Sequence, residues 1–353
     1  MQRNIIKRIL VCFIVAMLVV GCTTVLSVKS EETKYNGVES IKLDKEEINL
    51  YVGEMAAISY NYYYRSNFNN DFKFTWSSSN KKVATVSDGI ITAIESGKAD
   101  ITIKSGTAIA KCKVTVTLSE NQKKVNKIIN KIIKTEIKNN MKKVDKIKTI
   151  HDYIITTTKY DNDNYMSDTI PDISYTAAGV LLNGTAVCQG YAEAFQLFMD
   201  KLKIPCKTVN GKANGDFHAW NIVKIGDDWY WIDVTWDDKV PDEGRISYEY
   251  FLISDKELKK THDWETKDTA KGTKYKYYGY KDCTIDNIND IKNIVEKQKS
   301  LNYLTIVCPK SIKDKTLETA AKLFYEAKGL EYFRTAYSKF NVGNKIGYQI
   351  WIK

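Results

Sequence analysis

A cysteine stands at the start of a predicted apolar helix in "NGTAVCQGYAEAFQLFMDKL", residues 183–202. This thiol, Cys188, is followed 30 residues later by His218 in "DFHAWN", and 15 residues after that by Asp233 in "WYWIDVTWDD". Thiol, imidazole and carboxylate are the groups from which a nucleophilic cysteine site is built. The alternative is a packed core sulfur with an incidental histidine and aspartate.

Each residue type meets one need of acyl-transfer chemistry. A thiol reacts as its thiolate, which a helix N-terminus stabilises through its dipole and free N–H groups. The imidazole takes up the thiol proton and returns it to the leaving amine, while the carboxylate fixes the imidazole tautomer. Backbone N–H groups at the helix start can bind the oxyanion. Gln189 and Tyr175 are weaker candidates for a second oxyanion donor.

The elements after the helix predict how the three side chains meet. "CKTVNGK", "HAWNIVKIG" and "DWYWIDVTW" are strand-like, and "GDD" between the last two predicts a hairpin turn. His218 opens one strand of this hairpin and Asp233 lies in the other, so the two can face each other. If the N-terminus of the helix packs on this sheet, Cys188 joins them.

Neighbouring residues carry weaker expectations. Trp220 and Trp236 flank the proposed site and are candidates to line a substrate groove, although tryptophan more often packs within a sheet. Asp237 and Asp238 are predicted to form a solvated turn. His151, in "IHDYIITTTKYD", is predicted to be structural. No metal site is expected, because the chain has no Cys-x-x-Cys motif and no Cys/His cluster.

These motifs resemble the transglutaminase-like superfamily of papain-type cysteine enzymes. The matching text is "IHDYIITTTKYD", "NGTAVCQGYAEAF" and "FHAWNIVKIGDDWYWIDVTWDD", within roughly residues 125–265. The resemblance implies Cys188 as nucleophile, His218 as general base and acid, Asp233 as the orienting acid, and no cofactor. Many members have glycine two residues before the cysteine, where this chain has Ala186.

The region before this core alternates apolar and polar residues with the period of a strand. Its text "FTWSSSNKKVATVSDGIITAIESGKADITI" and the closing "CKVTV" resemble the bacterial immunoglobulin-like domains of group 2. Cys112 is predicted to be a buried apolar thiol beside Val114 and Val116. Cys206, Cys283 and Cys308 are likewise expected to pack in cores.

The N-terminus has the pattern of an export signal: Arg3, Lys7 and Arg8 precede an apolar run that is too short for a comfortable membrane span. Its ending "VVGC" resembles the lipobox of bacterial lipoproteins, which implies diacylation of Cys22. A plain signal peptide or an uncleaved anchor is the alternative. Removal of the three cations lowers the net charge from +10 to +7. No basic motif interleaved with aromatic residues indicates nucleic-acid binding.

The predicted fold class is therefore multidomain. An all-β immunoglobulin-like sandwich precedes an α+β papain/transglutaminase-like core, in which the pattern at 119–158 predicts two helices, and a small α+β unit follows. The predicted parts are a signal peptide with lipobox (1–22), a tether (23–37), an immunoglobulin-like domain (38–118), the core with its N-terminal helices (119–268) and a C-terminal unit of unknown role (285–353).

Together these features predict a cysteine enzyme, lipid-anchored on the outer face of a bacterial membrane, or secreted if the lipobox reading is wrong. It would attack peptide or isopeptide amides of a protein or peptide, for example in the cell wall. Hydrolysis is favoured over transamidation because water needs no second binding site. The alternative is a non-catalytic adhesion or wall-binding module.

Overall fold

The computed structural model describes residues 38–64, 72–240, 246–331 and 336–351. The predicted signal peptide, the tether and Cys22 lie outside the described residues. The chain divides into two compact units, residues 1–123 and 124–353. Every helix in the described ranges is too short or too polar to cross a membrane.

The first unit is built from short strands whose alternating residues face a shared core. The sheets are β1-β4, β2-β9-β8-β5 and β3-β7-β6, with β2 and β9 parallel. Cys112 on β9 is buried on the same face as Val114 and Val116, as predicted from the strand period. The strands are β1 Val38–Leu43, β2 Glu47–Tyr51, β3 Met55–Ala57, β4 Tyr60–Tyr64, β5 Thr75–Ser78, β6 Ala84–Ser87, β7 Ile90–Ala93, β8 Gly97–Ser105 and β9 Ala108–Thr117.

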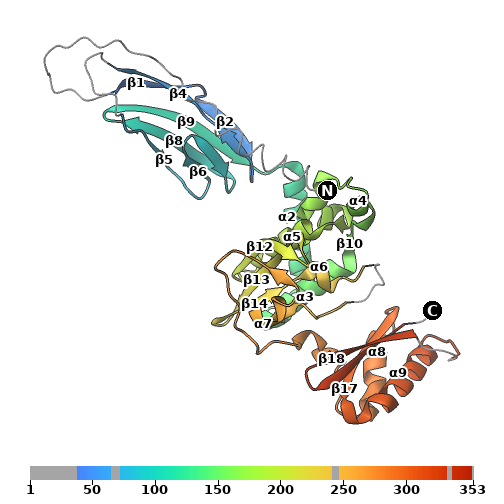
Figure 1. Cartoon of the computed structure of the whole chain (residues 1–353). Helices are drawn as coiled ribbons and strands as arrows, with labels where there is room; N and C mark the ends of the chain where they lie inside the picture. The colour runs from blue at the N-terminus through green and yellow to red at the C-terminus, as the bar shows by residue number, and fades with distance from the viewer. Residues whose placement is uncertain (1–37, 65–71, 241–245, 332–335, 352–353) are drawn as a thin grey trace. The chain divides into compact units, whose positions relative to one another are not determined.

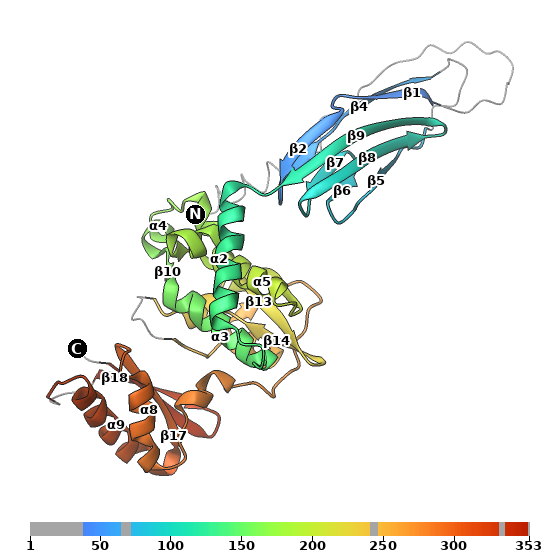
Figure 2. The same ribbon diagram turned by 180° about the vertical axis from the view of Figure 1, so that it is seen from behind.

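The second unit begins with helices and then forms an antiparallel sheet in the order β15-β14-β13-β12-β16. Helices α3 and α5 lie on one face of this sheet, as Figures 1 and 2 show from opposite sides. Its helical segments are α2 Glu120–Glu136, α3 Lys143–Thr157, α4 Asn162–Met166, η1 Asp172–Tyr175, η2 Gly179–Asn183, α5 Cys188–Lys201, α6 Val234–Asp237 and α7 Asp255–Leu258. Its strands are β10 Lys159–Tyr160, β11 Thr185–Ala186, β12 Cys206–Ala213, β13 Asp216–Ile225, β14 Asp228–Ile232, β15 Phe251–Ile253 and β16 His262–Asp263.

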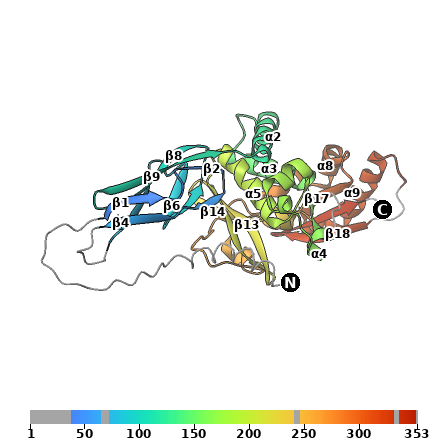
Figure 3. The same cartoon turned by 90° about the horizontal axis from the view of Figure 1, so that it is seen from above.

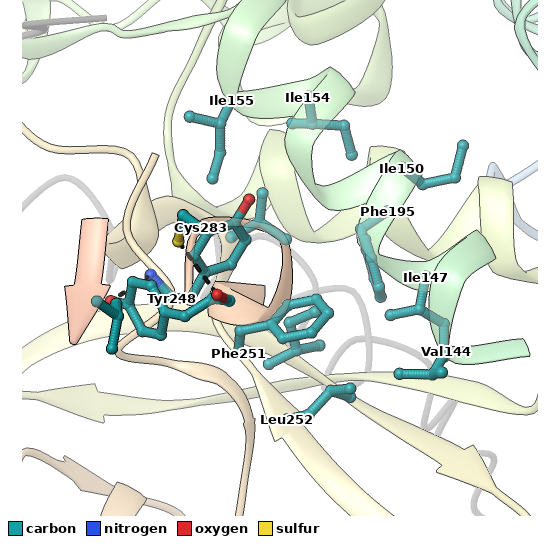
Figure 4. Close-up of a cluster of buried hydrophobic side chains, with 14 of the residues drawn as sticks. Val144, Ile147, Ile150, Ile154, Ile155, Phe195, Tyr248, Phe251, Leu252 and Cys283 are labelled. Carbon is teal, nitrogen blue, oxygen red and sulfur yellow. Dashed lines mark hydrogen bonds between the residues drawn. The ribbon is translucent and has the colours of Figure 1, made fainter. Parts of the chain in front are cut away.

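Apolar side chains hold these helices on the sheet. Figure 4 shows Ile147 and Ile150 of α3 beside Phe195 of α5, with Phe251 and Leu252 of β15 in the same cluster. All five are fully buried, and each such side chain contributes about 1.5–3 kcal/mol to folding. The other face of the sheet carries a second cluster that includes Trp220 and Trp231.

The C-terminal part of the second unit has a small α+β fold of its own. Its sheet has the order β17-β19-β18, and α8 and α9 pack together against β17 (Figure 3). The predicted fold class is confirmed in all three parts of the chain. The elements are η3 Tyr278–Cys283, η4 Ile288–Asp290, α8 Ile291–Gln298, β17 Tyr303–Pro309, η5 Lys310–Ile312, α9 Lys313–Ala327, β18 Ala336–Val342 and β19 Lys345–Trp351.

A glycine allows the first turn of α5 to approach η1 closely. A Cβ added to Gly190 would lie 2.7 Å from the carbonyl oxygen of Ser174, 2.9 Å from that of Thr176 and 3.0 Å from Cβ of Ala186. Two of these neighbours are backbone atoms, which cannot move aside without shifting the segment. The beginning of α5, where Cys188 stands, is thereby fixed against its surroundings.

Gly190→Ala should therefore lower the free energy of unfolding by about 1–3 kcal/mol, whereas Ala normally stabilises a helix relative to Gly. The measurement is urea unfolding followed by tryptophan fluorescence. This signal reports mainly on the second unit, since of the seven tryptophans only Trp76 precedes it. Lys201→Ala, at the exposed end of the same helix, is the control and should change little. Unaltered stability of Gly190→Ala would contradict the close approach.

Candidate functional site

The thiol of Cys188 lies at the first residue of α5, where several segments fix the backbone. The preceding strand β11 pairs in parallel with β10, and the N–H of Val187 donates to the carbonyl of Ser174 at 2.9 Å. The N–H groups of Gly190 and Tyr191 both donate to the Val187 carbonyl. The N–H groups of Cys188 and Gln189 precede them at the helix N-terminus, where no helical carbonyl faces them.

The β13–β14 hairpin brings the histidine and the aspartate to one end of the sheet. Its register pairs Asn221 with Ile232, so His218, before Asn221, and Asp233, after Ile232, lie at the same end. His218 Nε2 lies 2.7 Å from Asp233 Oδ2. Asp233 is one residue beyond β14, not within a strand as predicted, and it is the N-cap of α6.

The imidazole of His218 bridges the carboxylate and the thiol. Its Nε2 bonds to Asp233, and the Cys188 side chain lies close enough to the ring to raise the pKa of His218. Burial by itself lowers the pKa of His218, but Asp233 and Cys188 together raise it to about 10. The structure thus brings the three predicted residues together, with His218 hydrogen-bonded to Asp233 and the Cys188 side chain beside the ring.

The carboxylate of Asp233 is fully buried and accepts hydrogen bonds at both oxygens. Oδ1 accepts from the N–H of Trp236 at 3.0 Å, and Oδ2 accepts from His218 and from Nε2 of His262 at 3.0 Å. Burial raises the pKa of Asp233, but the two imidazoles outweigh this and hold it well below its usual range. Asp233 is therefore kept ionised.

His262 is a site residue that the sequence analysis missed. It belongs to "KKTHDWE", a segment without a motif, although the chain has only three histidines. Among the described residues, His218, Asp233 and His262 also form the set whose donor atoms, within 4.8 Å of one another, could hold a metal ion. A metal at these atoms would have to replace both imidazole hydrogen bonds to Oδ2.

The predicted groove residues have different positions. Trp220 is only 1% exposed, so the prediction that it lines a substrate groove is wrong; its ring stacks on that of His218 at 5.9 Å, inside the second apolar cluster. Trp236 is half-buried, with its ring 5.7 Å from His218, and remains able to face a substrate.

Of the two weaker oxyanion candidates, Gln189 follows the thiol on α5 and is half-buried, whereas Tyr175 ends η1 and is exposed. Two further tyrosines, Tyr160 and Tyr165, interact electrostatically with Cys188. Their rings are 6.0 Å apart, and burial is the main cause that raises the pKa of each. Tyr160 belongs to "IHDYIITTTKYD", one of the motifs that carry the family resemblance. This motif was the sequence signal that could have identified Tyr160 as a site residue.

The prediction of a solvated turn at Asp237 and Asp238 is wrong, because both side chains are buried. Asp237 Oδ2 lies 3.1 Å from Nε2 of His151, and Asp238 accepts a 2.5 Å hydrogen bond from the hydroxyl of Tyr191. Nδ1 of His151 lies 2.9 Å from Asp152. His151 therefore joins α3 to α6.

The other described thiols differ from Cys188 in environment. Cys283 and Cys308 are buried, as predicted, and Cys206 is half-buried at the start of β12. Burial raises the pKa of each of these three thiols. No disulfide links the cysteines in the described ranges.

Two family models match this chain. Residues 130–234 match the transglutaminase-like superfamily, and residues 37–128 match the bacterial Ig-like domain of group 2. The first match includes Cys188, His218 and Asp233. No curated protein matches the chain.

Three solved structures are also similar to parts of the chain. A TGase is 23% identical over 34% of this chain and 34% of the TGase chain, with a TM-score of 0.30. The matched region thus spans about a third of the length of the TGase. A candidate cysteine protease from Cytophaga hutchinsonii is 15% identical over 55% of this chain and 69% of its own, with a TM-score of 0.28.

Domains 5–6 of the S-layer protein SbsC are 25% identical over 23% of this chain and 45% of their own, with a TM-score of 0.20. The chain therefore contains a transglutaminase-like core over residues 130–234, preceded by a bacterial Ig-like domain of group 2 over residues 37–128.

Proposed function

We propose that this protein is a cysteine enzyme that cleaves peptide or isopeptide amides through Cys188, His218 and Asp233. The observation that supports the proposal is the 2.7 Å hydrogen bond between His218 and the buried Asp233 carboxylate, with the Cys188 side chain beside the same imidazole. His218 retains its proton well above neutral pH, so this imidazolium is able to stabilise a neighbouring thiolate. Asp233 accepts the hydrogen bond from Nε2–H of His218, which fixes the imidazole ring and supports the positive charge of that ring.

The proposed reaction proceeds through a thioester. The sulfur of Cys188 attacks the amide carbonyl carbon, and the N–H groups of Cys188 and Gln189 at the helix start stabilise the oxyanion. As the C–N bond breaks, Nδ1–H of His218 gives its proton to the leaving amine. A water molecule, deprotonated by His218, then attacks the thioester, releases the carboxylic acid and restores the thiol group. The steps use only protein groups and water.

Hydrolysis is favoured over transamidation because water needs no binding site of its own. In transamidation an amine, such as a lysine side chain, would replace water at the thioester. The partner is a protein or peptide, and the extracellular face of a bacterial membrane is the proposed location, where cell-wall peptides are available. The bacterial Ig-like domain supports a place at the cell surface.

Iodoacetamide labelling between pH 5 and 8 tests the activated thiol. Since His218 has a pKa of about 10, it remains protonated throughout this range and loses its proton only above it. Cys188 should therefore label at pH 6 at least about tenfold faster than in His218→Ala. Mass spectrometry assigns the label to its cysteine.

Cys206→Ala is the matched control, since it removes a half-buried thiol that is not part of the candidate site. This variant should label at Cys188 as the wild type does. Equal labelling rates in wild type and His218→Ala would favour the non-catalytic adhesion or wall-binding module.

Amide cleavage is measured with a peptide library that includes glutamine and isopeptide amides. We expect release of ammonia or amine together with a new carboxylic acid, and a loss of at least about 10³-fold in Cys188→Ala. Adding a lysine-like amine separates the two acceptors, because incorporation of this amine in preference to the acid product would overturn hydrolysis. The Cys206→Ala protein again serves as the unaffected variant.

The proposed lipid anchor is tested at Cys22, with the full chain expressed in a bacterium that processes lipoproteins. Cys22→Ala should move the protein from the membrane fraction to the soluble or secreted fraction, because acyl chains contribute about 0.8 kcal/mol for each buried methylene. Cys112→Ala leaves the lipobox intact and should remain with the membrane. Retention of Cys22→Ala in the membrane would rule out lipidation as the anchor.

A further inference from the structure

Asp233 is bonded by a second histidine that the proposed reaction does not use. Its Oδ2 accepts from Nε2 of His262 at 3.0 Å, on the same oxygen that accepts from His218 at 2.7 Å. The side chains of Asp233 and His262 are both inaccessible to solvent. While His262 is in place, solvent does not reach either side chain.

The orientation of His262 is fixed from both sides. As the first residue of β16 it pairs with Ala213 of β12, and its Nδ1 lies 2.8 Å from the hydroxyl of Thr261. With the hydroxyl donating to Nδ1, the ring proton lies on Nε2 and is directed to Asp233. This tautomer is assigned from the hydrogen-bond network.

Aromatic rings enclose the imidazole of His262. The ring centroids of Trp236, Trp220 and Tyr250 lie at 4.6, 4.9 and 5.4 Å from its own. Because this packing restricts rotation of the imidazole, the donor arrives at Oδ2 from one direction. The carboxylate plane is then defined by three donors from separate elements: β13, β16 and the first turn of α6.

We infer that His262 is a positioning residue for the proposed reaction: its Nε2–H fixes the Asp233 carboxylate, so that Asp233 keeps His218 directed at Cys188. This inference rests on the proposed function. Without His262, Oδ2 keeps a single donor, and the buried carboxylate is held less firmly against rotation about its Cβ–Cγ bond. His218 would then spend less time beside the thiol, with no change in any residue that touches the substrate.

Replacing His262 by asparagine or by glutamine separates its hydrogen bond to Asp233 from its packing role. The side-chain nitrogen of glutamine reaches the position of His262 Nε2, whereas that of asparagine reaches only the position of Nδ1. Iodoacetamide labelling of Cys188 at pH 6 should fall about tenfold or more in His262→Asn. In His262→Gln it should recover to within about threefold of the wild-type rate. A purely packing role for His262 would not give this rescue.

His151→Gln is the matched control, since His151 is the other buried histidine that bonds to a buried aspartate of this unit, in its case Asp237, and also lies beside Asp152. It should lower the midpoint of urea unfolding but leave the labelling rate within about twofold. If His262→Asn does not fold, Thr261→Val replaces it. That variant removes the hydroxyl that orients the ring, and it should also slow labelling.

The outcomes separate the two proposals. Wild-type labelling no faster than that of His218→Ala would overturn the proposed function, and the positioning role with it. Fast wild-type labelling that is unchanged in His262→Asn, or in Thr261→Val where the former does not fold, would overturn the positioning role alone. Equal slowing in His262→Asn and His262→Gln would also overturn it, because the donor would then make no difference.

Discussion

The charge of one carboxylate, buried away from water, constrains the arrangement of the whole candidate site. Burying such an ion costs several kcal/mol unless hydrogen-bond donors replace its water. Asp233 receives these donors from His218, His262 and the N–H of Trp236, which belong to three different elements. The end of β13, the edge strand β16 and the start of α6 must therefore meet at one point.

The short helix α6 carries a second buried carboxylate four residues after the first. Asp237 lies beside His151 of α3, while Asp233 caps the N-terminus of the same helix. Burial lowers the pKa of His151, but Asp152 and Asp237 outweigh it and raise the pKa. Two acid–imidazole groups thus hold α6, one to the end of the sheet and the other to α3.

The thiol is positioned mainly by backbone rather than by side chains. The strand β11 before it, the η1 segment beside it and the close approach at Gly190 fix the N-terminus of α5. Side-chain contacts fix the imidazole instead, because Trp220 stacks on the ring of His218 from the core. A fixed thiol next to a supported imidazole is the arrangement that nucleophilic cysteine chemistry requires.

The sequence by itself determined the features that depend on local pattern. Strand and helix periods, with turn residues between them, were enough for the fold class of all three parts, and the hairpin turn after Ile225 placed His218 and Asp233 at one end of a strand pair. The start of α5 at Cys188 likewise followed from the small-residue turn before an apolar run. Each of these signals lies within a few residues of the position that it predicts.

Tertiary structure alone decided which polar groups are buried and which partners they find. His262 reaches Asp233 only because a two-residue strand pairs at the edge of the sheet, and no sequence period announces so short a strand. Asp237 and Asp238 follow a pattern typical of an exposed turn, yet their partners, His151 and Tyr191, stand on helices far back in the chain. Trp220 was a weak candidate for a surface groove, with packing in the sheet as the alternative, and it is enclosed by residues of β12, β14 and the segment after β16. Burial is a property of what packs against a residue from elsewhere in the chain, and local sequence does not contain that information.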